Sequence, residues 1–137
     1  MEVSTLYQKY LECGKVSTDT RSISSGSMFF ALKGPNFNAN AFAADALEKG
    51  ARYAVVDDPV YTKDNRCLLV DDVLTALQLL ARYHRDQLSI PVIGLTGSNG
   101  KTTSKELVAA VLAKKFRTLA TQGNLNNHIG VPITILS

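Results

Sequence analysis

The pattern of apolar and polar residues predicts an alternation of helices and strands in the first part of the chain. In residues 2–13 the apolar side chains recur at the spacing of one face of an amphipathic helix. Residues 14–27 are polar and rich in Ser, Thr and Gly, so they predict a loop around a short extended piece. The apolar run MFFAL at 28–32 predicts a buried strand, and the Asn-rich segment KGPNFNAN at 33–40 predicts a second loop.

A second helix and two further strands follow. The helix is expected at 41–49, with Asn40 as its N-cap and Gly50 just after its last turn. The apolar runs at 51–57 and 66–70 predict strands. Strands and helices in alternation are typical of α/β proteins, so the first unit is expected to be a small α/β domain.

A break near residue 89 marks the expected boundary between two domains. Asp71 and Asp72 open a long helix, because acidic side chains are favoured at the positive end of the helix dipole. The helical pattern is then interrupted by Ser-Ile-Pro at 89–91. We therefore expect one domain at 1–88 and the beginning of another at 89–137.

The second domain is expected to begin with a β–loop–α–β unit. A strand in IPVIGLTG at 90–97 leads into a glycine-rich loop, a helix at about 100–115 and a strand RTLAT at 117–121. Two strands and one helix cannot cover both faces of a parallel sheet, and the chain reaches Ser137 within an apolar run. The second domain is therefore expected to be incomplete, and the chain to be the N-terminal fragment of a longer protein.

Composition narrows the possible classes of protein. The 137 residues are 45% hydrophobic and carry a net charge of only +3, which does not favour binding to nucleic acid. Neither a membrane span nor the apolar core of a signal peptide is evident, so a cytoplasmic protein is expected. Cys13 and Cys67 are far apart and are expected to be reduced, at least half-buried thiols. His84 and His128 lack metal-ligand spacing.

The stretch GLTGSNGKTT at 94–103 has the parts of a phosphate-binding loop but not the usual spacing. In the common pattern G-x-x-x-x-G-K-[ST] the first glycine would fall on Leu95, whereas the glycines stand at 94 and 97. A glycine loop at a helix start nevertheless points backbone N–H groups at an anion. Lys101 would bridge the outer phosphates, and the Thr102 hydroxyl would reach Mg²⁺. The alternative is an ordinary turn before a helix, with an exposed lysine.

Three separate segments resemble one family. TGSNGKTT resembles the T-G-[TS]-N-G-K-[TS] loop of the ATP-dependent Mur ligase superfamily, in which the first glycine is displaced as it is here. QGNLNNHIGVPITIL at 122–136 is similar to the G-N-x-N-N-x-x-G-V-P-x-T block of the members that add D-alanyl-D-alanine. Residues 17–56 resemble the N-terminal domain that holds the UDP end of the family's substrate. The resemblance covers nearly the whole chain, in order.

The resemblance implies two sets of site residues. Lys101 is the implied catalytic residue, holding the β and γ phosphates of ATP, and Thr102 is the implied Mg²⁺ ligand. The implied ATP-binding residues are Gly97, Ser98, Asn99, Gly100, Lys101, Thr102, Thr103, Asn124, Asn126 and Asn127. The implied UDP-binding residues are Thr20, Arg21, Lys33, Asn38 and Asn40. An Asn-rich capped turn is the alternative for the asparagine block, and a surface ion pair is the alternative for Arg21.

Two positions depart from the family pattern. Many members carry Asp-Gly-His where this chain has Asn38-Ala39-Asn40, which leaves the uridine contacts open. Many also carry an acid where this chain has His128, and no catalytic role is assigned to that histidine.

The implied reaction is ATP-dependent amide bond formation in peptidoglycan synthesis. ATP and Mg²⁺ would activate the terminal carboxylate of UDP-N-acetylmuramoyl-tripeptide as an acyl phosphate, which the amine of D-alanyl-D-alanine would attack. A monomer is expected, and the fragment alone is expected to be inactive. Two alternatives stay open, namely the Mur ligase that adds the third residue and a non-catalytic nucleotide-binding module. The asparagine block argues against the first, and Lys101 with Thr102 against the second.

Overall fold

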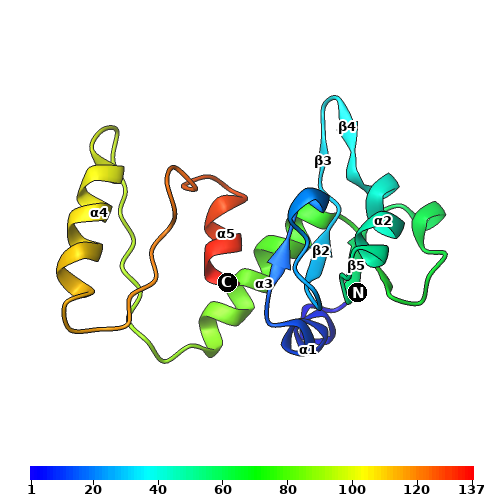
Figure 1. Ribbon diagram of the computed structural model, residues 1–137, viewed down its shortest axis with the longest axis horizontal. Helices are drawn as coiled ribbons and strands as arrows, with labels where there is room; N and C mark the ends of the chain where they lie inside the picture. Colours follow the sequence, from blue (N-terminus) through cyan, green and yellow to red (C-terminus); the bar gives the residue numbers. More distant parts are fainter.

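The computed structural model describes all 137 residues and contains a four-stranded parallel sheet. Its strands lie in the order β1 (Val16–Ser17), β2 (Met28–Phe30), β5 (Tyr53–Val56) and β6 (Cys67–Leu69). A separate antiparallel pair, β3 (Lys33–Gly34) and β4 (Phe37–Asn38), forms a hairpin that projects from the domain (Figure 1). The α/β fold class and the three longer strands agree with the prediction from apolar runs.

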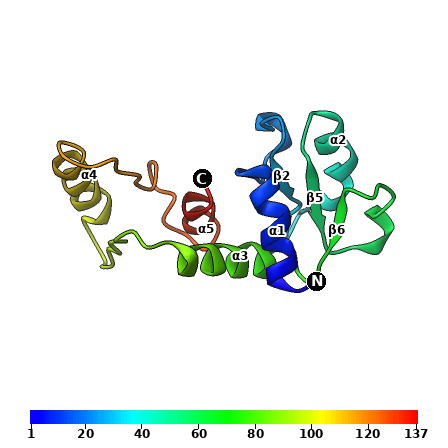
Figure 2. The same cartoon turned by 90° about the horizontal axis from the view of Figure 1, so that it is seen from below.

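Helices cover both faces of the sheet (Figure 2). One face packs against α1 (Val3–Cys13), α3 (Val73–Gln87) and the residue that follows α5 (Gly130–Ile135), whereas the other packs against α2 (Ala43–Glu48). Alternate residues of a strand point to opposite faces. Met28 and Phe30 accordingly join the first apolar cluster and Phe29 the second. Short 3-10 turns complete the domain at Thr20–Ser22, Ala39–Phe42 and Pro59–Tyr61.

The long helix α3 forms as its sequence predicts. The Asp72 side chain caps it by accepting a hydrogen bond of 2.7 Å from the Thr75 amide. Its buried face consists of Val73, Leu77, Leu80 and Ala81. These positions repeat at helical spacing, and burying them holds α3 against the sheet.

The segment 33–40 corrects two expectations. It is not a plain loop, because its two ends pair as the β3–β4 hairpin. Asn40 is not the N-cap of the following helix. The cap of the 3-10 turn is Asn38, whose side chain accepts from the Asn40 amide at 3.0 Å, and the N-cap of α2 is Phe42. The Asn40 side chain is fully buried and bonds to other parts of the fold.

The segment 90–121 also differs from its prediction. The helix forms as α4 (Lys101–Leu112), but neither 90–97 nor 117–121 is a strand. A strand persists only with a hydrogen-bonded neighbour, and neither segment has one here. Helix α4 stands apart from the sheet and buries none of its residues (Figure 1). No helix combines the length and the apolar character required to cross a membrane.

Helix α5 brings the end of the chain back to the first domain. It lies against α3 in both views (Figures 1 and 2), and Leu136, directly after it, is fully buried in the α1–α3 cluster. The Tyr10 hydroxyl donates to the Leu136 carbonyl at 3.1 Å, and the Gln78 amide donates to the His128 carbonyl at 3.1 Å. The core of the first domain therefore includes residues from beyond position 89, while the boundary at 89 stays a prediction.

Replacing Leu136 with Ala is expected to lower the free energy of unfolding by about 2 kcal/mol, because it leaves a void in the α1–α3 cluster. Urea unfolding followed by circular dichroism measures the change. Leu119→Ala is the matched control, since that leucine is 65% exposed and its loss should change the stability by less than about 0.5 kcal/mol. Equal effects of the two substitutions would contradict the docking of α5.

Candidate functional site

The carboxyl ends of the parallel strands gather most of the predicted uridine-side residues. The loop after β1 carries Thr20 and Arg21, and the segment after β2 forms the hairpin with Lys33 and Asn38. Since all four strands run in parallel, these segments leave the sheet at one edge. Ligands of open α/β sheets bind at this edge.

A hollow of about 360 Å³ lies at this edge. Two aromatic side chains on its wall are solvent-accessible, Phe37 at 58% and Phe42 at 50%. Flat apolar rings beside a guanidinium suit a ligand that joins an aromatic ring to an anionic group. The residues lining the hollow are Thr18, Asp19, Thr20, Arg21, Phe29, Phe37, Ala39 and Phe42.

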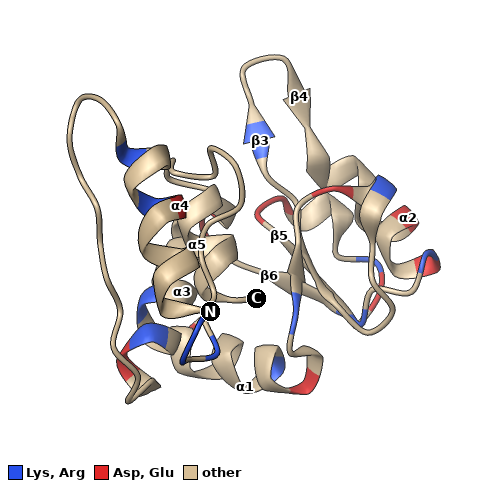
Figure 3. Cartoon of the chain, turned by 60° about the vertical axis from the view of Figure 1, so that its left-hand side comes forward, with Lys and Arg blue, Asp and Glu red and all other residues tan.

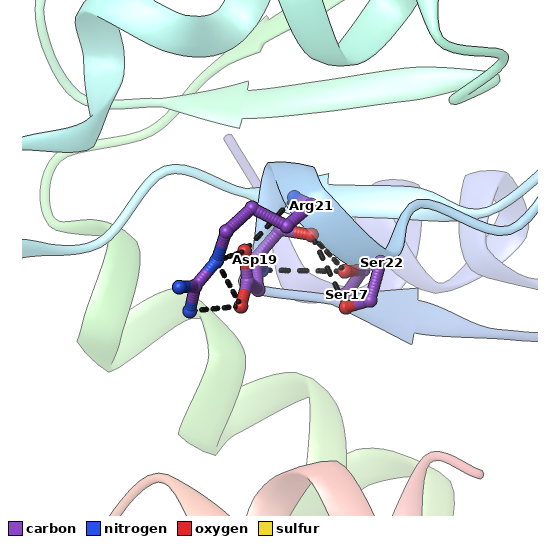
Figure 4. A network of polar contacts seen from close by, with 4 residues as sticks. All are labelled: Ser17, Asp19, Arg21 and Ser22. Atoms are coloured by element: carbon purple, nitrogen blue, oxygen red, sulfur yellow. Dashed lines mark hydrogen bonds and ion pairs between the residues drawn. The ribbon is translucent and has the colours of Figure 1, made fainter.

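Arg21 is held by a local ion pair with Asp19 (Figure 4). Asp19 Oδ1 accepts from Arg21 Nε at 3.0 Å and Oδ2 accepts from Nη2 at 2.7 Å. The hydroxyls of Ser17 and Ser22 both donate to the Asp19 carbonyl, at 3.1 and 3.4 Å. The Arg21 side chain is 88% exposed, so the pair lies on the surface. The side-chain hydrogen bond from Arg21, with that from its amide, lowers the pKa of Asp19 to about 2.

Three other predicted uridine-side residues do not line the hollow. Lys33, Asn38 and Asn40 belong to a polar network with Asp57, which directly follows β5. Asn40 is completely buried, and its amide group bonds only to Asn38 and Asp57. Asp57 was missed from the sequence, because an acid directly after an apolar strand resembles an ordinary turn residue.

The glycine loop leads directly into the N-terminus of α4. Gly100 occupies the N-cap position with φ of 75°, and Gly97 has φ of 145°, both of which favour glycine. No side chain caps this end of the helix, so the amides of its first turn are available to a ligand. Lys101 Nζ donates to the Gly97 carbonyl and therefore lies over the loop. An uncapped positive helix end with a lysine beside it fits a phosphate chain.

The predicted metal position has one candidate protein ligand, the hydroxyl of Thr102. Thr102 is exposed at the start of α4, as are Ser98, Asn99 and Thr103. The chain contains no cluster of three or more His, Cys, Asp or Glu side chains that could hold a metal ion. The Thr102 hydroxyl fits the one-ligand contribution that the loop pattern implies, since such loops share Mg²⁺ with phosphate oxygens.

The asparagine block is attached to α5 and not to the glycine loop. Asn127 Oδ1 accepts from the amides of Ile129 and Gly130, at 3.2 and 2.7 Å, and so closes the start of α5. Asn124 and Asn126 are exposed, and no hydrogen bond joins any of the three to the glycine loop.

One side chain of α4 does reach the start of the asparagine block. Lys105 Nζ donates to the Thr121 carbonyl and, at 3.2 Å, to the Gly123 carbonyl. Nothing in the sequence pattern distinguished this lysine from a surface residue. It is the hydrogen-bonding link between α4 and the start of this block.

Neither the two cysteines nor His128 has the surroundings of a reactive side chain. Both cysteines are free and partly buried, as expected, and burial raises the pKa of Cys13 to about 11 and also raises that of Cys67. A thiol with a raised pKa is a poor nucleophile at neutral pH. The His128 side chain makes no hydrogen bond, and only its carbonyl is used, by Gln78.

Comparison with known proteins gives a consistent result. The Mur ligase family, catalytic domain, matches residues 13–85, and the Mur ligase middle domain matches residues 95–137. The chain is 44% identical over 124 residues to UDP-N-acetylmuramoyl-tripeptide–D-alanyl-D-alanine ligase of Bacillus subtilis, covering 89% of this chain and 27% of the relative. For the enzyme of Escherichia coli the identity is 46% over 121 residues, covering 88% and 26%.

Solved structures agree with these relatives. A crystal structure of MurF from Acinetobacter baumannii superposes with a TM-score of 0.83 at 37% identity, over 98% of this chain and 32% of that one. MurF ligase from Thermotoga maritima in complex with ADP superposes with a TM-score of 0.80 at 32% identity, over 92% and 29%. The chain thus spans between 26% and 32% of the length of these relatives.

Replacing Arg21 with Gln is expected to raise the pKa of Asp19 from about 2 toward its ordinary value of 3.8, because the side-chain hydrogen bond is lost. The rise should be incomplete, since the residue 21 amide still donates to Asp19. Titration of the carboxyl carbons by NMR measures it. Arg66→Gln is the control, because Asp64 pairs with Arg66 in the same way and also has a pKa of about 2. An Asp19 pKa that stays near 2 without Arg21 would contradict the pairing.

Proposed function

The chain belongs to the Mur ligase family, and from this premise we propose that it is part of an ATP-dependent ligase that joins D-alanyl-D-alanine to UDP-N-acetylmuramoyl-tripeptide. The observation that carries the proposal is the match of two consecutive Mur ligase domains, together with 44% identity to a ligase of that name over 89% of this chain. The reaction would serve peptidoglycan precursor synthesis in the cytoplasm, with the protein acting as a monomer.

The ATP side of the proposed site is the start of α4. The glycine loop and the first-turn amides hold the phosphates, and the Lys101 ammonium leaves the Gly97 carbonyl to neutralise the outer phosphates. Thr102 would contribute its hydroxyl to Mg²⁺. When bound, ATP supplies the phosphoryl group that activates a substrate carboxylate, and ADP is released. Asn124, Asn126 and Asn127 would border the nucleotide from the α5 side, as uncharged donors and acceptors.

The UDP side of the proposed site is the hollow at the carboxyl edge of the sheet. Phe37 and Phe42 would flank the base, Thr20 would contact its polar edge, and Arg21 would contact the diphosphate. Lys33 and Asn38 stand at the base of the hairpin beside this hollow. Asn40 would act from inside the fold, because it is buried. We assign this side to a domain at 1–88 and the ATP side to the part of a second domain at 89–137.

The complete protein that carries these residues should release phosphate from ATP only when both UDP-tripeptide and D-alanyl-D-alanine are present. Lys101→Met should lower kcat on the order of a hundredfold or more, because it removes a charge that stabilises the migrating phosphoryl group. Lys114→Met, two residues beyond the end of the same helix, is the matched control and should leave kcat unchanged. Phosphate release with a single amino acid as acceptor would transfer the assignment to the ligase that adds the third residue.

The 137-residue chain alone is expected to bind UDP without catalysing the ligation, since it spans less than a third of its relatives' length. Isothermal titration calorimetry with UDP tests the binding. Arg21→Gln should weaken it roughly tenfold, by the loss of a charge-assisted contact to phosphate. Arg66→Gln should not change it. Turnover by the chain alone, or unchanged affinity without Arg21, would refute the corresponding part of the proposal.

A further inference from the structure

We propose that Asp57 is a positioning residue for the uridine side of the site. Its buried carboxylate fixes the base of the β3–β4 hairpin and thereby sets the place of Phe37 on the wall of the hollow. Asp57 does not itself line the hollow. The ligand part of this inference rests on the proposed function, whereas the part that concerns the hairpin does not.

Asp57 is the acidic residue of this network, and its carboxylate is buried. Its side chain is only 1% exposed. Oδ1 accepts from Asn40 Nδ2 at 2.8 Å and lies 3.0 Å from Lys33 Nζ, and Oδ2 accepts from the Val73 amide at 3.2 Å. The Asp57 amide in turn donates to Asn40 Oδ1 at 3.0 Å. Both carboxylate oxygens are therefore used inside the protein, which identifies the group as part of the framework.

These bonds join three elements that are distant in the sequence. Asp57 stands at the carboxyl end of β5, Val73 begins α3, and Lys33 begins the hairpin. Lys33 is paired with Asn38 across the hairpin, so these two residues form its base. Asn38 is tied to the same network, because its Oδ1 accepts from Asn40 Nδ2 at 2.8 Å. Both strands of the hairpin are thus held where they leave the domain.

The hairpin depends on this anchorage because it has little support of its own. It contains only two pairs of residues, and an isolated two-stranded hairpin is marginally stable in water. It projects from the domain, and its basic segment on β3 marks its base (Figure 3). Phe37 packs its ring against Gly34, where a Cβ atom would lie 2.2 Å from a ring carbon. The ring is therefore fixed relative to the hairpin, and the base fixes the hairpin relative to Arg21.

The charge state of Asp57 supports this role. Burial by itself raises the pKa of Asp57, but the hydrogen bonds from Asn40, Lys33 and the Val73 amide outweigh burial and leave the pKa below its ordinary value. The other charged group that faces it is Asp72, at the start of α3. A lowered pKa in the folded state means that the anchorage is intact at neutral pH and is lost only as the pH falls through that value.

The test compares Asp57→Asn with Asp45→Asn in the 137-residue chain. Asp45 pairs with Lys49 at 2.9 Å on α2, with both side chains partly exposed, so its substitution removes an Asp–Lys ion pair that does not belong to the network. Hydrogen exchange of the hairpin amides is measured without ligand, and the Kd for UDP is measured by calorimetry. Asp57→Asn should speed exchange at 33–38 relative to the amides of β2 and β5, and should weaken UDP binding roughly tenfold. Asp45→Asn should change neither quantity.

Each other outcome has a definite meaning. Exchange that rises equally throughout the sheet, or an unchanged hairpin in Asp57→Asn, would overturn the positioning role. Faster exchange of the hairpin with an unchanged Kd would overturn its link to the ligand. If the chain itself does not bind UDP, the proposed uridine site fails, while the exchange data still decide the anchorage. If Asp57→Asn does not fold, Lys33→Met replaces it, because it removes the exposed partner alone and should loosen the same hairpin in the absence of ligand.

Discussion

A parallel sheet must be covered on both of its faces, and the arrangement of the first domain follows from this requirement. The two covers differ in size. Large side chains such as Phe30 and Leu77 fill the side of α1 and α3, whereas small ones such as Ala46 and Ala54 let α2 approach closely on the other. The same parallel order sends every strand end to one edge. The candidate uridine site lies at this edge because the loops that can carry ligand-binding groups emerge there.

The conformation of the glycine loop depends on its own residues and not on the packing of a sheet. Gly97 and Gly100 adopt backbone conformations that other residues avoid, and the hydrogen bonds of the helix that follows join residues only four positions apart. Loop and helix therefore form although the strands predicted on either side do not. Phosphate binding of this type requires backbone amides, a lysine and a hydroxyl. These lie within a few consecutive residues and do not need a completed sheet.

The sequence alone predicted the elements that depend on neighbouring residues, but it did not predict contacts between residues that are distant in the chain. Helical spacing identified α1, α3 and α4, and apolar runs identified β2, β5 and β6. The prediction that Asn40 is the N-cap of the following helix was wrong, because an asparagine before a helix looks the same in the sequence whether its side chain caps that helix or bonds to Asp57. The strand expected at 117–121 is absent, because a strand needs a hydrogen-bonded neighbouring strand, and the apolar character of a segment does not show whether one is present. Among the candidate site residues, Lys101 and Arg21 could be predicted from motifs, whereas Asp57 and Lys105 become evident only through contacts across the fold.

The return of α5 to the first domain has a mechanical consequence. Asn127 accepts hydrogen bonds from the amides of Ile129 and Gly130 at the start of α5, and α5 lies against α3. The glycine loop is instead carried by α4, which stands clear of the sheet. The two borders of the nucleotide position, namely the glycine loop and the asparagine block, are thus attached to different parts of the fold. The polar connection between them is the long, flexible side chain of Lys105. A rotation of α4 relative to the sheet would therefore open or narrow the space between the two borders. A change in the orientation of α4 would then also change the affinity for the nucleotide.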